Sequence, residues 1–299
     1  MSLLVVGSIA FDSVKTPYGE VTDALGGSAV YFSYAASFFT PVRVVGVVGE
    51  DFPEEHLAEL GKRNVDTAGV QRTGGKTFRW SGSYEGAMNE AETLDVQLNV
   101  LGDFDGKLPE SYVDSDYVFL ANGPPAMQHG VVDQVRSPKL IVADTMNHWI
   151  TDTRDELKTL IARVDGLVMN EGEARQYTGD DNLPRAGRKL LEEGPNFVVI
   201  KKGEHGALLV TPDEFFAVPA YPSVDVNDPT GAGDSFAGGM MGHLAQVDDV
   251  CVTELKRALI YGTIVASINV EGFSLDRFKT ISHDDIERRY EAFRNMMTF

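Results

Sequence analysis

Residues 228–239 read DPTGAGDSFAGG and join a polar, proline-containing segment to an apolar run that is compatible with a helix from about Ser235 to Leu244. Two glycines, Gly231 and Gly233, allow the backbone to turn tightly and allow a ligand to approach the main chain. The first turn of a helix presents free N–H groups and the positive end of the helix dipole. A loop that enters a helix in this way therefore predicts a binding site for an anion, most naturally a phosphate.

Asp234 is expected in the first turn of that helix, directly beside the predicted anion site. A carboxylate next to a phosphate would weaken simple binding, because the two negative charges repel each other. It is useful, however, as a general base that takes the proton from an attacking hydroxyl group. The segment therefore predicts phosphoryl transfer to an alcohol. The structural alternative is a glycine-rich helix start that packs closely on a neighbouring element.

The segment is neither of the two common phosphate-binding loops. The chain contains no G-x-x-x-x-G-K-[ST] motif, and Phe236 stands where G-x-G-x-x-G requires its third glycine. Instead, DPTGAGDSF closely resembles the C-terminal signature of the ribokinase-like (PfkB) carbohydrate kinases. In that family the Gly-Ala-Gly amides form an anion hole and the following Asp is the catalytic base. The resemblance assigns the anion hole to Gly231, Ala232 and Gly233, and the base to Asp234.

Composition limits the classes of partner. The chain has 299 residues, 43% of them hydrophobic, which suits one domain over residues 1–299. A formal charge of −19 argues against nucleic acids and anionic membranes as partners, because both need basic patches. No run of about 18 apolar residues suggests a membrane span. Cys251 is the single cysteine and the N-terminus has no cationic leader, so we expect a cytoplasmic location.

Short apolar runs alternate with helix-compatible segments, and each run ends in polar residues. The clearest runs are residues 3–6, 42–48, 117–120, 140–143, 166–169 and 197–200. The pattern predicts βαβ units and a doubly wound α/β fold, with a mostly parallel sheet and a ligand site at the carboxyl ends of its strands.

Two further segments, 77–84 and 93–100, alternate with a period of two residues, which is typical of half-exposed antiparallel strands. They resemble the small β lid that the family folds over its acceptor. We expect this lid to be contributed mainly by about residues 12–25 and 70–100.

The resemblance places the acceptor site near the N-terminus. Asp12, which we expect in a loop after the first strand, matches the family's Asp that accepts hydrogen bonds from substrate hydroxyls. Gly26 and Gly27 match the Gly-Gly turn whose backbone approaches the sugar. Tyr31 stands where the family usually has an Asn that reads substrate hydroxyls. Tyr31 could donate a hydrogen bond, stack on a ring, or simply pack as a helix aromatic.

On the nucleotide side, residues 198–207 read as strand, turn and strand, and resemble the family's nucleotide-binding segment. Lys201 could approach the phosphates of ATP, and Gly203 and Gly206 would allow a tight turn beside the nucleotide. Thr230, inside the signature itself, is also assigned to the nucleotide by the resemblance.

Two cation sites are implied by the resemblance. Asn170 and Glu173 match an N-x-x-E motif that helps to hold Mg²⁺, largely through water, and Mg²⁺ commonly keeps several waters. The structural alternative is that these residues cap the helix, because glutamates in a first helical turn favour the helix dipole. In some members the acid that opens the signature, here Asp228, also binds a monovalent cation, so activation by K⁺ stays open.

Three functions remain open at this stage. The main prediction is transfer of the γ-phosphoryl group of ATP to a hydroxyl of a sugar or sugar-like acceptor. A nucleoside kinase of the same family would share every ATP-side feature, and Tyr31 with the lid aromatics Phe78, Trp80 and Tyr84 could accommodate a base. The third is a non-catalytic sugar sensor, against which the intact Asp234 argues. The lid strands could also pair between two subunits and form a homodimer.

Overall fold

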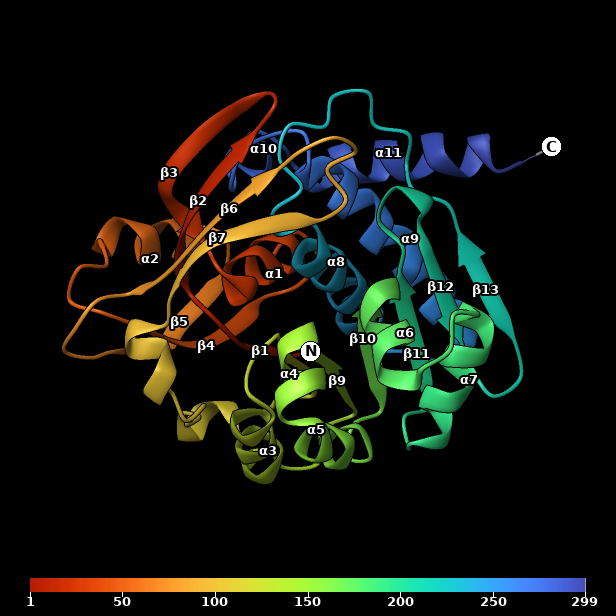
Figure 1. Cartoon of the computed structure of the whole chain (residues 1–299), viewed down its shortest axis with the longest axis horizontal. Helices are drawn as coiled ribbons and strands as arrows, with labels where there is room; N and C mark the ends of the chain where they lie inside the picture. The colour runs from red at the N-terminus through yellow and green to blue at the C-terminus, as the bar shows by residue number, and fades with distance from the viewer. Residues whose placement is uncertain (299) are drawn as a thin grey trace.

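The computed structural model describes residues 1–298, which form a nine-stranded sheet, helices on both of its faces and a separate four-stranded sheet (Figure 1). The large sheet has the order β13-β12-β11-β10-β9-β8-β1-β4-β5. Its strands pair in parallel, except that β12 pairs antiparallel with both β11 and β13. The predicted α/β fold with a mostly parallel sheet and a small β lid is therefore confirmed.

The bounds of the strands follow the apolar runs. The large sheet contains β1 (Leu3–Val6), β4 (Val42–Val48), β5 (Val65–Arg72), β8 (Tyr117–Leu120), β9 (Leu140–Asp144), β10 (Gly166–Asn170), β11 (Phe197–Lys201), β12 (Ala207–Val210) and β13 (Phe215–Val218). The six apolar runs predicted β1, β4, β8, β9, β10 and β11 to within one residue at either end. Parallel strands covered on both faces are continuously apolar, which makes them easy to recognise in a sequence.

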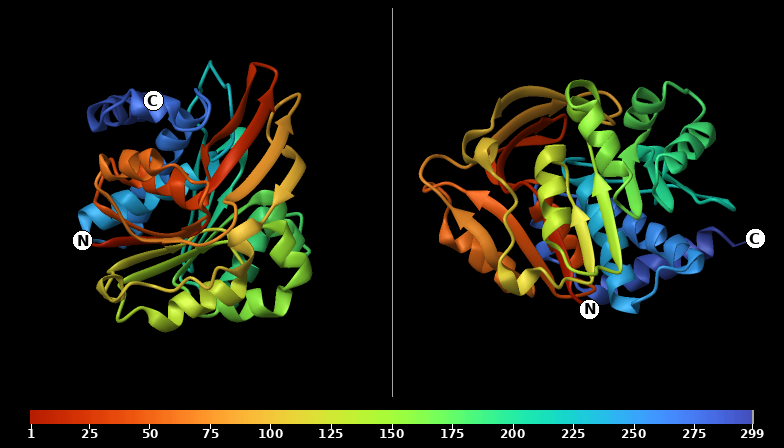
Figure 2. Two further views of the ribbon diagram at one scale, coloured as in Figure 1. Left: turned by 90° about the vertical axis from the view of Figure 1, so that its left-hand side faces the viewer. Right: turned by 90° about the horizontal axis from the view of Figure 1, so that it is seen from below.

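Helices cover the two faces of the large sheet, and Figure 2 shows the blue C-terminal helices and the green central helices on opposite sides. One side carries α1 (Ser28–Ala36), α2 (Glu54–Gly61), α8 (Ala232–Val247), α9 (Val252–Asn269), α10 (Asp276–Lys279) and α11 (His283–Met296). The other side carries α3 (Pro125–Gln134), α4 (Asn147–Asp152), α5 (Arg154–Ile161), α6 (Glu171–Thr178) and α7 (Leu183–Glu192). Short 3₁₀ turns are η1 (Asn99–Asp103), η2 (Glu110–Tyr112) and η3 (Gly203–His205).

The core has two halves, one on each face of the sheet. In the central strand β1, Leu3 and Val5 pack into the half that contains α1, α8 and α9, whereas Leu4 and Val6 pack into the half that contains α5 and α6. Successive side chains of a strand point to opposite faces, so this short strand joins both halves. All four side chains are fully buried.

The lid consists of β2 (Ala10–Thr16), β3 (Gly19–Gly26), β6 (Phe78–Tyr84) and β7 (Ala91–Gln97), in the order β3-β2-β6-β7. Two details differ from expectation. Asp12 lies within β2 and not in a loop, and residues 70–72 belong to β5 of the large sheet. Asp is depleted from strands, which is why the pattern around Asp12 suggested a loop. In Figure 1 the lid strands run together beside the end of the large sheet that contains β4 and β5.

Among residues 1–298, no helix combines the length and the apolar character that crossing a bilayer requires.

Candidate active site

The signature segment forms the loop that enters α8, and the helix begins at Ala232, three residues earlier than expected. Gly231 precedes it with a φ of 74°, in the left-handed region that favours glycine. A Cβ atom at Gly231 would lie 2.3 Å from Cγ of Tyr31, so the packed tyrosine ring excludes any side chain there. Both the backbone conformation and the packing therefore require glycine at this position.

The N–H groups at the start of α8 are not all equivalent. The N–H of Ala232 donates to the carbonyl of Pro229 over 3.0 Å, and that of Ser235 donates to the carbonyl of Gly231 over 2.8 Å. Within residues 1–298 no backbone acceptor accompanies the N–H groups of Gly231 and Gly233. These two donors are available to an anion, whereas Ala232 would have to leave its turn to join the predicted anion hole.

Asp234 lies in the first turn of α8 and is half-buried. The pKa of its carboxyl is raised to about 7 by the loss of hydration and by repulsion from Asp144, while the positive charge of Lys201 opposes the rise. A general base works best when its pKa lies close to the working pH. The environment of Asp234 therefore suits proton abstraction near neutrality.

The acceptor-side residues converge on the same place. Asp12 is 5% exposed and its pKa is raised to about 7, first by burial and then by the charges of Asp234 and Asp228, against a hydrogen bond from the Gly27 amide. A Cβ atom at Gly26 would lie 2.0 Å from Oδ2 of Asp12, so the predicted Gly26-Gly27 turn is what makes room for this carboxylate. Asp12 and Asp234 thus share one buried, negatively charged site although they come from distant parts of the chain.

Tyr31 projects from α1 into this group of carboxylates and is 1% exposed. Burial raises its pKa well above the usual value, and the charges of Asp12, Asp228 and Asp234 add to the rise. Its hydroxyl makes no hydrogen bond of ordinary length in the part of the chain that the structure describes, although it lies near enough to Asp12 to lower the pKa of that carboxyl. A buried hydroxyl without a partner costs about 1–3 kcal/mol, so a ligand that bonds to it would recover that free energy.

The lid reaches the signature loop through Tyr84, at the end of β6. The hydroxyl of Thr230 donates to the phenol oxygen of Tyr84 over 3.4 Å, and burial raises the pKa of Tyr84 to about 12. The β2–β6 register pairs Asp12 with Trp80, so Phe78, Trp80 and Tyr84 share the face of the lid that bears Asp12. The lid therefore presents aromatic side chains on the face that bears Asp12.

Lys201, at the end of β11, lies directly over the first turn of α8. A Cβ atom at Gly233 would lie 3.1 Å from its Nζ, which places the ammonium beside the predicted anion hole. Its Nζ also lies 3.0 Å from Oδ2 of Asp144, the last residue of β9. Burial alone would lower the pKa of Lys201, but the charges of Asp144, Glu173 and Asp234 together raise it.

Asp144 is the residue of this site that the sequence interpretation did not select. It is 4% exposed and contributes both to the environment of Asp234 and to the position of Lys201. The signal available in the sequence was its place at the end of the apolar run 140–143, at the carboxyl edge of the sheet.

The turn predicted to approach the nucleotide forms η3. Gly203 and Gly206 have φ values of 52° and 87°, and a Cβ atom at Gly206 would lie 2.0 Å from the carbonyl oxygen of Val218. The side chain of Asn89, at the tip of the lid, donates to Oε1 of Glu204 over 2.8 Å. The glycines are thus required by the backbone, and the turn lies at the tip of the lid.

Asn170 and Glu173 form a reciprocal cap at the start of α6. The Glu173 amide donates to Oδ1 of Asn170 over 2.8 Å, and the Asn170 amide donates to Oε2 of Glu173 over 2.6 Å. The two residues therefore cap the helix, which is the structural alternative to a role in metal binding. Glu173 is nevertheless 5% exposed, and its pKa is raised by burial and by the charge of Asp144. A capping carboxylate that is also buried beside other acids has an environment that suits a cation.

Asp228, the first residue of the signature, is 1% exposed and its pKa is raised by burial. Its Oδ1 accepts a hydrogen bond from the Thr230 amide over 2.9 Å. Its Oδ2 has no hydrogen-bond partner within residues 1–298. This buried oxygen is a candidate ligand for a cation.

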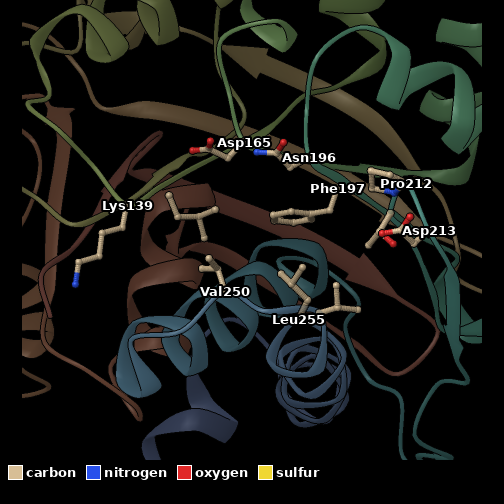
Figure 3. A pocket seen from close by; sticks show the side chains of 11 residues that line it. Lys139, Asp165, Asn196, Phe197, Pro212, Asp213, Val250 and Leu255 are labelled. Carbon is tan, nitrogen blue, oxygen red and sulfur yellow. The ribbon is translucent and has the colours of Figure 1, made fainter.

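Two hollows in the surface lie away from these residues. The one in Figure 3 encloses about 200 Å³ between the start of β9, the start of β11 and the beginning of α9, at the opposite edge of the sheet. A second, of about 370 Å³, adjoins the connection between β5 and β6. Neither is lined by a predicted site residue, so the candidate active site is defined by its convergent side chains.

Comparison with known proteins identifies the family that the signature segment resembles. The family model for the pfkB family carbohydrate kinases matches residues 2–278. A cytidine kinase from Thermococcus kodakarensis is 31% identical over 248 residues, which is 81% of this chain and 87% of that protein.

Solved structures share the fold. The nucleoside kinase from Methanocaldococcus jannaschii, an archaeal member of the ribokinase family, superposes with a TM-score of 0.79 at 19% identity and covers 97% of this chain and 98% of that one. An E. coli protein described as a ribokinase II, in complex with ATP and Mg²⁺, gives a TM-score of 0.79 at 20% identity, with 97% and 99% covered. Because the family model matches nearly the whole length of this chain, the chain belongs to the pfkB family of carbohydrate kinases, which are phosphotransferases with an alcohol group as acceptor.

Proposed function

We propose that this chain is a nucleoside kinase, which transfers the γ-phosphoryl group of ATP to a hydroxyl of a nucleoside. One observation carries this choice: Phe78, Trp80 and Tyr84 line the face of the lid that bears the acceptor carboxylate of Asp12. A sugar hydroxyl can donate to Asp12 while the base stacks on an aromatic ring, and such stacking contributes about 1–3 kcal/mol per base. The similarity to a cytidine kinase over 81% of the chain supports the same choice.

A kinase for a free sugar is the second candidate. It is favoured by the unpartnered hydroxyl of Tyr31 and by the carboxylate of Asp12, because both bind hydroxyl groups and neither requires a base. The two candidates share the chemistry described below and differ only in how the lid is used.

The reaction forms a bond between the acceptor oxygen and the γ-phosphorus of ATP, and breaks the bond between that phosphorus and the bridging oxygen. The electron pair of the broken bond remains on ADP, and the acceptor proton passes to the carboxylate of Asp234. The N–H groups of Gly231 and Gly233 and the ammonium of Lys201 face the charge that the phosphoryl oxygens carry. On the nucleotide side, we assign Thr230 and the turn formed by Gly203 and Gly206 to ATP.

The residues also fit a magnesium ion that accompanies ATP. The negative charges of Asp144, Glu173 and Asp234 all act on the ammonium of Lys201, so negative charge exceeds positive charge within this group. Among residues 1–298 no cluster of three or more His, Cys, Asp or Glu side chains forms a metal cage. Glu173, with Asn170 behind it, would therefore hold Mg²⁺ through water, and the ion would offset charge on the phosphates.

Activation by K⁺ is expected from the free Oδ2 of Asp228. Replacing NaCl by KCl at constant ionic strength should raise turnover of the native chain, because a buried carboxylate oxygen without a donor is a ligand for a weakly hydrated cation. Asp228→Asn should remove the difference between the two salts, measured as ATP consumption. Equal turnover of the native chain in both salts would rule out this cation site.

The direct test of the function is ATP consumption with Mg²⁺ against nucleosides, free sugars and sugar phosphates. Turnover with at least one nucleoside and a much lower kcat/KM for every sugar is the expected result. Turnover restricted to free sugars would establish the second candidate. Stabilisation by a sugar without any ATP consumption would indicate a binding protein.

Trp80→Ala should raise KM for the nucleoside about 10-fold, because the stacking surface for the base is lost, and should change KM for ATP less than twofold. Initial rates at varied nucleoside concentration provide the measurement. Phe215→Ala, at an aromatic residue on the far edge strand β13, is the matched control and should leave both KM values unchanged. If the KM for the nucleoside is unchanged in Trp80→Ala, the base does not stack on this residue of the lid.

A homodimer through the lid remains part of the proposal. The edge strand β7 has no neighbour on its outer side and is followed by exposed Leu98, while Leu94 and Val96 within it are 58% and 49% exposed. An edge of this kind can pair with the same edge of a second copy. Leu94→Lys should convert a dimer to a monomer in sedimentation equilibrium, and a monomeric native chain would exclude the pairing.

A further inference from the structure

Lys201 and Asp144 form a largely buried ion pair at the carboxyl ends of β11 and β9, which lie on either side of β10 in the large sheet. The Lys201 side chain is 17% exposed and that of Asp144 is 5% exposed, with 3.0 Å between Nζ and Oδ2. A buried pair of this kind contributes little net stability, because both charges lose their hydration. Its position beside the start of α8 points to a role in the reaction.

The carboxylate of Asp144 is held rigidly. Its Oδ1 accepts the Thr145 amide over 2.8 Å. Its main-chain carbonyl accepts from Nε2 of the fully buried Gln128 over 3.1 Å, and the same nitrogen donates to the carbonyls of Leu120 and Ala121 at 3.2 and 3.0 Å. Gln128 thus fastens the end of β9 to the end of β8. Asp144 has little freedom to move relative to the sheet.

The ammonium of Lys201, which Asp144 holds, has N–H groups that make no hydrogen bond within residues 1–298. A lysine ammonium carries three N–H groups. Within residues 1–298 the Nζ of Lys201 has one hydrogen-bond acceptor, Oδ2 of Asp144. The same Nζ lies 3.1 Å from the place that a Cβ atom of Gly233 would occupy. Two N–H groups are therefore left beside the free amides of the predicted anion hole.

We propose that Asp144 is a positioning residue, which holds Lys201 so that its two remaining N–H groups donate to the oxygens of the phosphoryl group during transfer. This rests on the proposed phosphoryl transfer. Lys201 stays protonated throughout: the acceptor oxygen bonds to the γ-phosphorus, the bond to the bridging oxygen breaks toward ADP, and the acceptor proton passes to Asp234. A fixed cation aimed at the reacting group stabilises the transition state without rearranging.

Asp144 has a second effect, which concerns the base. The charges of Asp144, Glu173 and Asp234 all act on the ammonium, and among residues 1–298 its hydrogen bond goes to Asp144. If Lys201 paired with Asp234, its N–H would cover a carboxylate oxygen that must receive a proton, and the base would weaken. The hydrogen bond to Asp144 directs the cation away from Asp234 and leaves the base open.

The test is a double-mutant cycle on the full chain, with the nucleoside or sugar that gives the highest turnover in the panel. Lys201→Met should lower kcat about 10²–10³-fold, as loss of a transition-state donor does. Asp144→Asn should lower kcat about 10–10²-fold, because a displacement of about 1 Å is enough for such a loss. KM for the acceptor should change less than twofold in both. The double variant should be no slower than Lys201→Met alone.

A structural role predicts a different outcome. Losses of kcat that multiply in the double variant, or a kcat per folded molecule that is unchanged in Asp144→Asn, would overturn the proposal. Asp144→Glu keeps the charge and serves if the Asn variant does not fold; it should still lower kcat at least about 10-fold, because the carboxylate moves by one methylene group. Native-like kcat in Asp144→Glu would also contradict the positioning role.

Lys139→Met is the matched control. Lys139 also pairs with a carboxylate, Asp248, over 2.7 Å, but at the opposite edge of the sheet, where Figure 3 shows its side chain extending away from the other labelled residues. Its kcat should equal that of the native chain. If the native chain turns over no acceptor in the panel, the proposed function itself fails and this inference falls with it; if it turns over and the cycle is additive, only the inference fails.

Discussion

Asp234→Asn will lower kcat by about 10²–10⁴-fold, the range that a general base contributes. The amide has nearly the same shape as the carboxylate but cannot take the acceptor proton. Its neutral group also removes the repulsion between residue 234 and a bound phosphate, so ATP binding should be retained or slightly tightened. Initial rates together with the dissociation constant for a non-hydrolysable ATP analogue separate the two effects. Full turnover in this variant would be incompatible with the base assignment.

The same assignment fixes the pH dependence. Because the pKa of Asp234 is raised to about 7, the deprotonated base is lost as the pH falls through neutrality. We expect kcat to decline below about pH 7 in the native chain, approaching a tenfold loss per pH unit. Asp225→Asn, at an exposed acid nine positions before Asp234, is the control and should retain both the rate and the profile.

Gly231→Ala will damage both folding and turnover. The residue has a φ of 74°, and an added Cβ atom would lie 2.3 Å from Cγ of the buried Tyr31 ring. The left-handed conformation costs about 1–2 kcal/mol for a non-glycine residue and overpacking about 1–3 kcal/mol, so we expect roughly 2–5 kcal/mol of destabilisation. The displaced loop should also lower kcat by about 10²-fold, since an anion-hole donor moves.

Urea unfolding and initial rates measure the two effects of Gly231→Ala. Gly61→Ala is the matched control, because no atom lies within 4 Å of a Cβ atom at Gly61. Combining Gly231→Ala with Tyr31→Ala should cost less stability than the sum of the two single losses, because the clash disappears while the backbone strain and the cavity left by the ring remain. A Gly231→Ala variant as stable and active as the native chain would contradict the described packing.

The sequence was most informative where one kind of residue repeats along a short segment. The continuous apolar runs of β1 and β8 locate the parallel sheet, because strands that are buried on both faces are typically apolar throughout. It was less informative for β3, where exposed acids and glycines hide a strand that is paired only with β2. Strand pairing there depends on a partner and not on the local pattern.

The same contrast between local patterns and distant partners applies to the residues of the candidate site. Residues inside a compact motif, such as Gly231 and Asp234, were recognisable from their neighbours in the chain. The pairing of Lys201 with Asp144 was not, because 57 positions separate them and only the parallel packing of the sheet brings them together. The consequence of Tyr31 was equally hidden: its ring lies against Gly231 and its hydroxyl stands unpartnered among three acids.

The raised pKa values of Asp12 and Asp234 also affect the stability of the ligand-free protein. Each has a pKa of about 7 in the folded chain and an ordinary value of 3.8 otherwise. A carboxyl whose pKa is raised by folding favours the folded state below the ordinary value, and that contribution is lost as the pH rises from about 4 to 7. The free energy of unfolding of the ligand-free protein is therefore lower near neutral pH, where Asp234 is deprotonated and can act as a base. A bound acceptor whose hydroxyls donate hydrogen bonds to Asp12 and Asp234 would restore part of that stability.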